Sequence, residues 1–548
     1  MKKYIISLII VSLFLTSSCD FSLEEHPYNA GGDMIDYPAG GAQMVTAIYN
    51  VFWSTELMKK SYMETIDMDH DHAAAPTWVV SGAGEGNITT HWSYNTAADP
   101  FNAFYKLINR ANYAIDNLPL VKDLSEELLN QYMGDAKFLR AFGYFHLVRM
   151  YGGVPLRLTF NTPLDMPRAS VMEVYNQIEK DLTEASEVLP WKTQGDNWGR
   201  ANRIASKLLL ARVYSNIASA SLSGSVNMEV DIKGQIKTFV TDTVAGFKGI
   251  DASSYYTKIK NLCDEVIATR GIYYDLRPTF KEIWGGANIR NNEFVWGITG
   301  NSQLEYTTAH LGYYYSAIPY NGRGWAGMTE HAFSLYRDAD ERGEHGIFHY
   351  VKQSFTATSA YVRIPDDISK YPTGPDGKAS RAVADYYNII FPTKWFLGDV
   401  VNPQPVTVDP GYAYQAQDII MIRFVDAYLL RAEARNELND PSGALDDLDV
   451  VRKRAKANLY ERYTTNKTTI RSLVLEERAM EFVQEFNRKF DLLRWGLYLK
   501  VMNAVGFVRV QGTGLTITKT REPRSLLYAV PLNEININKN FGPNNPGW

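Results

Sequence analysis

The strongest constraint on this chain is the return of apolar residues at helical spacing in one long segment after another. Residues 101–118 give the clearest case, with apolar side chains at Phe104, Leu107, Ile108, Ala111 and Ile115. Steps of three and four residues place such side chains on one face of an α-helix. Comparable segments span 124–150, 173–189, 203–220 and 255–269. Helices separated by short breaks pair antiparallel, which predicts a mainly α fold with a tetratricopeptide-like α-α superhelical scaffold.

Residues 275–415 interrupt this pattern, because Gly, Pro and Tyr become frequent there and the helical period fades. Helical spacing returns in 419–438, 443–457 and 469–486. A chain of 548 residues is also too long for one ordinary core. We therefore predict five segments: a signal peptide (1–18), an extended tether (19–40), an N-terminal helical region (41–274), a loop-rich, partly β insertion (275–415), and a C-terminal helical region with an irregular C-terminal wrap (416–548).

The N-terminus has the features of a bacterial lipoprotein signal. Lys2 and Lys3 precede an apolar run, residues 5–15, that is too short to span a bilayer. Small residues then lead directly to Cys19, in an arrangement that resembles a lipobox. This predicts removal of residues 1–18 and acylation of Cys19. Ordinary secretion with an incidental cysteine is the alternative.

Two segments contain aromatic residues that follow no helical period and that we expect to be exposed. A sugar offers C–H groups that pack on aromatic faces and hydroxyls that need donors and acceptors, so Trp and Tyr beside Asn or Arg suit it. The first segment, 67–94, contributes Trp78, Trp92 and Tyr94. The second, 313–325, contributes Tyr314, Tyr320, Asn321, Arg323 and Trp325. We predict that these side chains bind the ligand, whereas Trp284 and Trp296 are expected in the core.

The run Asp67-x-Asp69-His70-Asp71-His72 invites a metal hypothesis. Alternation along a strand would put the Asp and His side chains on opposite sides, and no Glu follows at the EF-hand distance. We therefore interpret the run as a polar loop near the ligand site and assign no metal and no cofactor. A Ca²⁺ or Zn²⁺ site is the alternative.

The charge and motif content favour a binding protein over an enzyme. A net charge of −5 and a pI near 6.1 argue against a broad nucleic-acid surface. A glycosidase needs two placed carboxylates, and none of the 61 acidic residues stands out as such a pair. Glu433, Glu477 and Glu481 instead suggest a structural ion-pair network with nearby arginines. A purely structural or protein-binding role is the third class, and buried loop aromatics would favour it.

A series of short motifs, in order along residues 19–548, resembles the SusD/RagB family of outer-membrane nutrient-binding lipoproteins. The motifs include Cys19-x3-Leu23-Glu24-x2-Pro27, the segment from Ala136 to Pro155 with Tyr151-Gly-Gly-Val-Pro155, Arg423-Phe-Val-Asp426, Glu477-Arg478-x2-Glu481, Arg488-x-Phe490-Asp491-Leu492-x-Arg494-Trp495-Gly496, Tyr528-x-Val-Pro531 and Asn545-Pro546-Gly547. Asn487 and Lys489 depart from the pattern, since the family more often has Gly and Trp there.

The resemblance implies a lipid-anchored protein at the outer-membrane cell surface. It implies a SusC-like TonB-dependent transporter barrel as partner, over which the family sits as a lid. Most of the family binds oligosaccharides and some members bind peptides. The expected function is therefore capture of oligosaccharides and their delivery to the transporter, with a peptide or another nutrient as the alternative ligand.

Replacing the predicted lipidated cysteine tests the anchor. The substitution Cys19→Ala removes the thiol that would carry the lipid, so we expect the protein to move from the membrane fraction to the soluble periplasmic fraction. Cell fractionation with immunoblotting measures this. An unchanged membrane fraction would contradict the lipobox interpretation.

Overall fold

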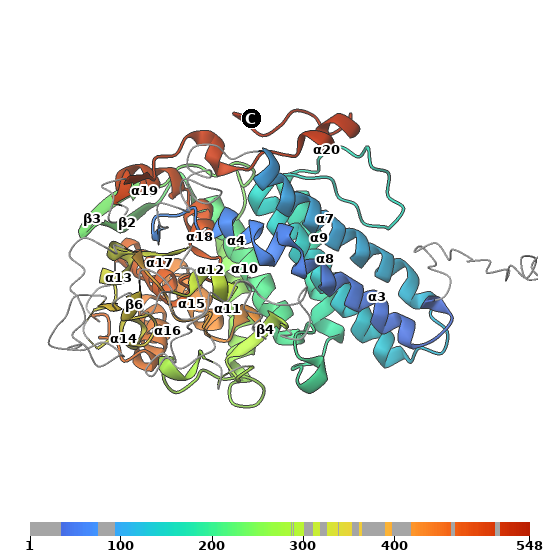
Figure 1. Cartoon of the computed structure of the whole chain (residues 1–548), viewed down its shortest axis with the longest axis horizontal. Helices are drawn as coiled ribbons and strands as arrows, with labels where there is room; N and C mark the ends of the chain where they lie inside the picture. Colours follow the sequence, from blue (N-terminus) through green and yellow to red (C-terminus); the bar gives the residue numbers. More distant parts are fainter. Residues whose placement is uncertain are drawn as a thin grey trace, which may run out of the picture.

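The body of the protein is a stack of α-helices in which sequence neighbours pack on one another (Figure 1). The computed structural model describes residues 34–74, 94–285, 288, 290–300, 311–317, 326–337, 339–352, 361–363, 389–396, 418–461, 466–509 and 516–548. The main helices of the first half are α3 (Ala39–Tyr49), α7 (Tyr94–Asn117), α8 (Glu126–Tyr151), α9 (Val171–Val188), α10 (Arg203–Leu222) and α11 (Ala252–Ala268). Because α7 to α11 each pack on the next, the predicted mainly α, superhelical fold is confirmed.

Shorter helical pieces complete this half of the chain. They are η1 (Asn50–Trp53), η2 (Thr55–Lys59), α4 (Ser61–Ile66), η3 (Leu118–Leu120) and η4 (Gly195–Asn197). Within the described segments, none of the helices has the length and hydropathy that a bilayer span requires. The predicted signal peptide and most of the tether, up to residue 33, lie outside the described residues.

Local sequence signals explain where these helices begin and how closely they pack. Ser170 caps α9 by accepting a hydrogen bond from the Glu173 N–H, and the Glu173 side chain accepts one from the Ser170 N–H in return. On α8, a Cβ at Gly143 would lie 2.9 Å from Ile108 Cγ1 of α7. The missing side chain therefore allows α7 and α8 to approach closely.

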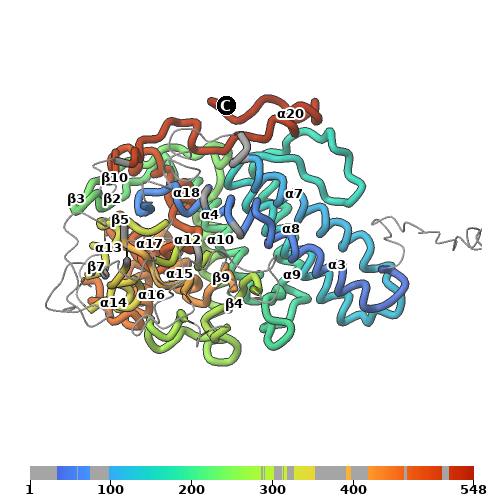
Figure 2. The backbone as a smooth tube through the Cα atoms, in the orientation of Figure 1, coloured from blue at the N-terminus to red at the C-terminus, as the bar shows by residue number. Residues whose placement is uncertain are grey.

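The loop-rich region is inserted between two neighbouring helices of the stack. Helix α11 packs directly on α15 (Val425–Glu437), although more than 150 residues separate them in sequence. The insertion contains η5 (Phe280–Glu282), β4 (Phe294–Ile298), α12 (Leu311–Tyr315), β5 (Gly327–Thr329), α13 (Glu330–Ser334), α14 (Glu341–Glu344), β6 (Tyr350–Lys352), β7 (Tyr361–Arg363) and β8 (Ile389–Ile390). Figure 2 shows β5, β7, α13 and α14 at the end of the molecule opposite α3.

The helix predicted to begin at residue 419 is wrong in its first turn. Residues 419–423 form strand β9 (Ile419–Arg423), which pairs antiparallel with β4. All five residues are buried, and three of them are the β-branched Ile. The first four residues are apolar, and so short an apolar run has no periodicity that separates a strand from a helix, whereas β-branched residues favour the strand. Trp296 of β4 is fully buried, as expected.

The last part of the chain returns to helices and then wraps over the stack. After α15 follow α16 (Pro441–Arg454), α17 (Lys467–Glu481), α18 (Arg488–Arg494) and α19 (Tyr498–Val505). Two hairpins had no counterpart in the sequence prediction, β2 (Asn227–Ile232) with β3 (Gln235–Val240) and β10 (Phe507–Arg509) with β11 (Thr516–Thr518). The C-terminal wrap holds η8 (Pro523–Leu526) and α20 (Leu532–Ile537). Figure 1 shows α20 at the top of the molecule, and after it Asn545 Nδ2 donates to the carbonyl of Tyr151, the last residue of α8, at 3.0 Å.

A buried ion-pair network joins the insertion to the C-terminal helices. Arg423, 1% exposed, donates to Glu481 at 2.7 Å and to Glu293 at 2.8 Å. Arg454 reaches the same two carboxylates, at 2.7 and 2.9 Å. Glu433 pairs with Arg494 at 2.6 Å and Glu477 with Arg452 at 2.7 Å. The structural network expected from the sequence is thus confirmed for Glu433, Glu477 and Glu481.

Removing one cation from this network should cost far more than removing an exposed one. We expect Arg423→Ala to lower the free energy of unfolding by about 3–5 kcal/mol, since Glu293, Glu481 and Glu485 each lose one buried positive partner. Denaturant unfolding followed by circular dichroism measures the change. Lys122→Ala is the matched control, because the Lys122–Asp36 pair is largely exposed and should leave the transition unmoved. Equal shifts in both variants would contradict the assigned role of the network.

Candidate functional site

The structure describes the two segments predicted to bind ligand mainly where they join the body of the protein. We call residues 67–74 the first root, and residues 313–317 with 326–329 the second root. Trp78 and Trp92 of the first segment lie outside the described residues, and Tyr94 begins α7 but its side chain is not described. Residues 318–325 of the second segment also lie outside the described residues, and they include the predicted contacts Tyr320, Asn321, Arg323 and Trp325. The geometry of the candidate site is therefore described from the contacts of its roots.

Strand pairing brings the roots of the two segments together. Strand β1 (Ala73–Ala74) pairs antiparallel with β5, so that Ala73 lies opposite Met328 and Ala74 opposite Gly327. The Thr329 N–H also donates to the His72 carbonyl at 2.8 Å. Strand β8 pairs with the other edge of β5 and completes a three-stranded sheet. Residues 73–74 of the first segment therefore lie beside residues 327–329, which directly follow the second segment.

A buried hydrogen bond ties the same two segments a second time. The Tyr315 hydroxyl donates to Asp67 Oδ2 at 2.8 Å, across 248 residues of sequence. Asp67 Oδ1 accepts the Phe486 N–H at 3.0 Å. Burial raises the pKa of Asp67 to about 7, although both hydrogen bonds act to lower it. The carboxyl that links the segments therefore titrates near neutral pH.

The other acidic residues of the run from Asp67 to His72 are matched by basic residues from the C-terminal half. Asp69 accepts from Lys489 at 2.6 Å and from Arg521 at 2.7 Å. Asp71 pairs with Arg488 at 2.6 Å. Burial acts to raise the pKa of Asp69 and Asp71, but the neighbouring positive charges outweigh it and hold both pKa values below the ordinary range.

The pairing revises the interpretation of this run as a polar loop. Asp67, Asp69, His70, Asp71 and His72 are all buried, because each carboxylate has a partner inside the protein. Burial also lowers the pKa of His70 to about 3, so its ring is neutral. Among the residues that the structure describes, no group of three or more His, Cys, Asp and Glu side chains could hold a metal ion. The carboxylates serve instead to fix the first root.

Tyr314 differs from the other predicted contacts because its side chain is described. It is 7% exposed and belongs to the main hydrophobic core. Its ring therefore has no open face on which a sugar could stack, and this position supports the second root. Next to it, the Ala326 N–H donates to the Tyr314 carbonyl at 3.3 Å, which closes the base of the segment.

Comparison with known proteins identifies the family. The family model described as "Starch-binding associating with outer membrane" matches residues 20–215. The model of the SusD family matches residues 292–548. Together the two models account for most of the chain, in order. The chain belongs to the SusD/RagB family.

Relatives of this SusD/RagB protein are similar over nearly its full length. SusD-like protein P25 of Formosa agariphila is 22% identical, over 98% of this chain and 97% of the relative. A solved SusD homolog from Bacteroides thetaiotaomicron has a TM-score of 0.72 at 19% identity, covering 94% of this chain and 99% of that one. The surface glycan-binding protein A from the same species, solved in complex with laminarihexaose, has a TM-score of 0.66 at 17% identity, covering 92% and 98%.

The sequence did not reveal the residues that hold the roots of the candidate site. Lys489, Arg488 and Arg521 lie more than 400 residues from their Asp partners. No local pattern links residues so far apart. One signal was present, because Lys489 stands where the family more often has Trp, and its Nζ now meets the Asp69 carboxylate in a fully buried position.

Asp67 should make stability depend on pH in a defined direction. The Asp67 carboxyl has a pKa of about 7 in the folded protein, whereas an Asp in the unfolded chain has a pKa near 4, so the folded protein holds the proton more tightly. The stability that Asp67 contributes is therefore full below about pH 4 and is lost as the pH rises through about 7. We expect the stability advantage of the wild type over Asp67→Asn to be larger at about pH 5 than at about pH 8. Denaturant unfolding of both proteins at the two pH values measures it.

Tyr315→Phe is the companion variant for Asp67. This variant keeps the Asp67 carboxyl but removes a hydrogen bond that lowers the pKa of Asp67, so that pKa should rise. The pH at which the stability contributed by Asp67 is lost should therefore be higher than in the wild type. A difference between wild type and Asp67→Asn that does not change with pH would contradict the titration assigned to Asp67.

Proposed function

We propose that this protein is a lipid-anchored, cell-surface glycan-binding protein that captures oligosaccharides and delivers them to a TonB-dependent transporter. One observation carries the proposal. Two segments rich in Trp, Tyr, Asn and Arg, residues 67–94 and 313–325, are anchored to each other by the β1–β5 pair and by the Asp67–Tyr315 hydrogen bond. Residues on both segments can therefore act on one ligand, although they are far apart in sequence.

The family supports the proposed location and ligand class. Its first model carries the description "Starch-binding associating with outer membrane", and a fold neighbour has been solved with laminarihexaose bound. The N-terminal run that ends in Cys19 suits a lipid anchor. A transporter barrel as partner rests on family membership, and the role is one of binding without chemistry on the ligand.

The proposed contacts are those that the sequence suggests, apart from the buried Tyr314. They are Trp78, Trp92, Tyr94, Tyr320, Asn321, Arg323 and Trp325. Each polar contact to a sugar replaces a hydrogen bond to water, so it adds only about 0.5–1.5 kcal/mol net. Ring stacking adds buried apolar area. After the cost of association, a few such contacts give an affinity in the micromolar to millimolar range.

Glycan binding with and without the loop aromatics tests the proposal. We expect the wild type to bind at least one neutral oligosaccharide in a glycan array, followed by calorimetry. Trp78→Ala, Trp92→Ala or Tyr320→Ala should weaken that binding about tenfold, which corresponds to about 1.4 kcal/mol. Phe160→Ala is the matched control, because Phe160 is an exposed aromatic residue, 42% accessible, in the connection between α8 and α9.

The outcomes separate the parts of the proposal. Glycan binding that none of the three substitutions weakens would refute the site. Binding of peptides in place of glycans would refute the ligand class and leave the family unaffected.

A further inference from the structure

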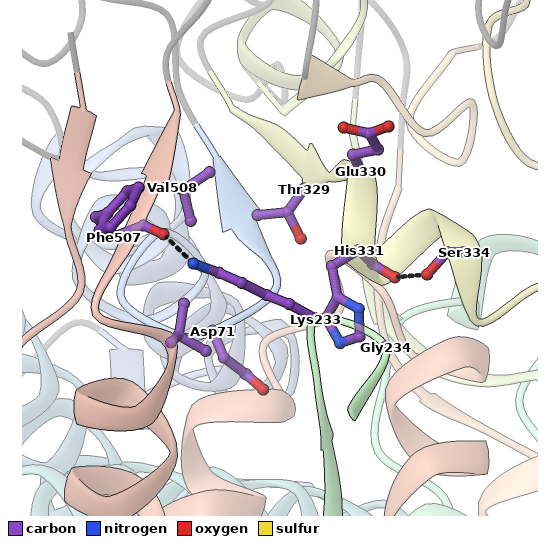
Figure 3. Close-up of a pocket in the computed structure, with 10 residues that line it drawn as sticks. Asp71, Lys233, Gly234, Thr329, Glu330, His331, Ser334, Phe507 and Val508 are labelled. Atoms are coloured by element: carbon purple, nitrogen blue, oxygen red, sulfur yellow. Dashed lines mark hydrogen bonds between the residues drawn. The ribbon is translucent and has the colours of Figure 1, made fainter. Parts of the chain in front are cut away.

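A cavity of about 430 Å³ lies beside the strands that anchor the two loop segments (Figure 3). Three parts of the chain that are distant in sequence meet around it. They are the turn of the β2–β3 hairpin at Lys233 and Gly234, the start of β10 at Phe507 and Val508, and the junction of β5 with α13 at Thr329 to Ser334. Asp71 reaches it from the first root. The cavity volume falls in the range of about 300–1,000 Å³ typical of small-molecule sites.

One wall combines an aromatic ring with a positive charge. Phe507 is 50% exposed, so part of its ring is open to solvent. The Lys233 Nζ donates to the Phe507 carbonyl at 2.7 Å and lies 4.5 Å from the centre of the Phe507 ring. An ammonium group has three donors, so Lys233 can still donate to a ligand.

The hairpin turn holds Lys233 in place. Lys233 and Gly234 have positive φ angles of 53° and 83°, as the two central residues of a type I′ turn require. The Gly234 N–H donates to Asp231 Oδ1 at 2.7 Å, which closes the turn. Figure 3 shows the Lys233 side chain extending from this turn across to β10.

The opposite wall offers further polar groups. Glu330 is exposed and adds a carboxylate. His331 donates from Nε2 to the Asp231 carbonyl at 3.1 Å, so its Nδ1 is an acceptor when the ring is neutral. The Thr329 hydroxyl oxygen accepts the Ala332 N–H at 3.1 Å, and a hydroxyl also carries a proton that it can donate. A ligand between the walls thus meets both donors and acceptors.

The charges around the cavity balance. Asp71 is paired with Arg488 at 2.6 Å, and Lys233 and Glu330 contribute one charge of each sign. A cavity without excess charge favours a neutral ligand over an anionic one. An aromatic face beside mixed donors and acceptors is the arrangement that suits the C–H face and the hydroxyls of a sugar.

We infer that this cavity is a second saccharide subsite, which binds part of the same neutral oligosaccharide that the two loop segments hold. The inference rests on the proposed function. The cavity adjoins the loop roots, since Thr329 lines it and its N–H bonds to the His72 carbonyl of the first root. A chain that occupies both places binds more tightly than one that reaches only the first, because its second contact is intramolecular.

Calorimetry with a length series of neutral β-glucan oligosaccharides, from the disaccharide to the hexasaccharide, tests the subsite. For the wild type we expect affinity to rise with length. Phe507→Ala removes the ring and Lys233→Asn removes the charge, while Asn tolerates the positive φ of the turn. Each variant should weaken hexasaccharide binding about five- to tenfold and flatten the dependence on length.

Lys237→Asn is the matched control, because Lys237 is an exposed lysine of the same hairpin. It should bind like the wild type at every length. A wild type that binds no member of the series, nor any glycan in an array, would refute the proposed function itself. If the affinity of the wild type rises with length, and Phe507→Ala and Lys233→Asn bind every oligosaccharide with the same affinity as Lys237→Asn, the subsite is refuted and the proposed function is not. If Phe507→Ala loses its thermal transition, Lys233→Asn on the separate hairpin decides the question.

Discussion

Buried charge pairing is the interaction on which the rest of this structure depends. Arg423 and Arg454 share Glu481 and Glu293 in a region with almost no exposed surface. Taking an ion out of water costs several kcal/mol unless its partners are well placed. Any shift of the insertion relative to the C-terminal helices would separate these charges. The network therefore fixes the position of the insertion, which interrupts the helix stack between α11 and α15.

The same principle holds the candidate site in place. Asp69 and Asp71 are buried and matched by Lys489, Arg521 and Arg488. The chain has two cysteines, and Cys263 is buried and free. A secreted protein often fixes such long-range contacts with disulfides. Here ion pairs and the β1–β5 strands fix residues 67–74 of the first segment to the body.

The accuracy of the sequence prediction follows the range of the interactions involved. Helices α8 to α11 were predicted to within three residues at each end, since a helical period and its caps are local, whereas α7 begins seven residues before its predicted start at residue 101. Strand β9 was mistaken for a helix because a buried apolar run has no period. The partners of Asp69 and Asp71 were not foreseen, because no local pattern encodes contacts that span hundreds of residues. The hairpin β2–β3 was missed although its signal is local, since Met228, Val230 and Ile232 alternate as buried residues before a turn at Gly234. The two ligand-binding segments remain a prediction from composition, which indicates chemistry but not geometry.

The contacts that hold the base of the candidate site have a physical consequence for the proposed capture role. Strand pairing, Tyr315 and the ion pairs are contacts within the protein, so ligand does not have to supply the energy that assembles them. Preorganised contacts lower the cost of binding. Open stacking surfaces still give only modest affinity, and affinity differences among related complexes lie mostly in the dissociation rate. Under the proposed function, such a site would hold an oligosaccharide and then release it to the proposed transporter.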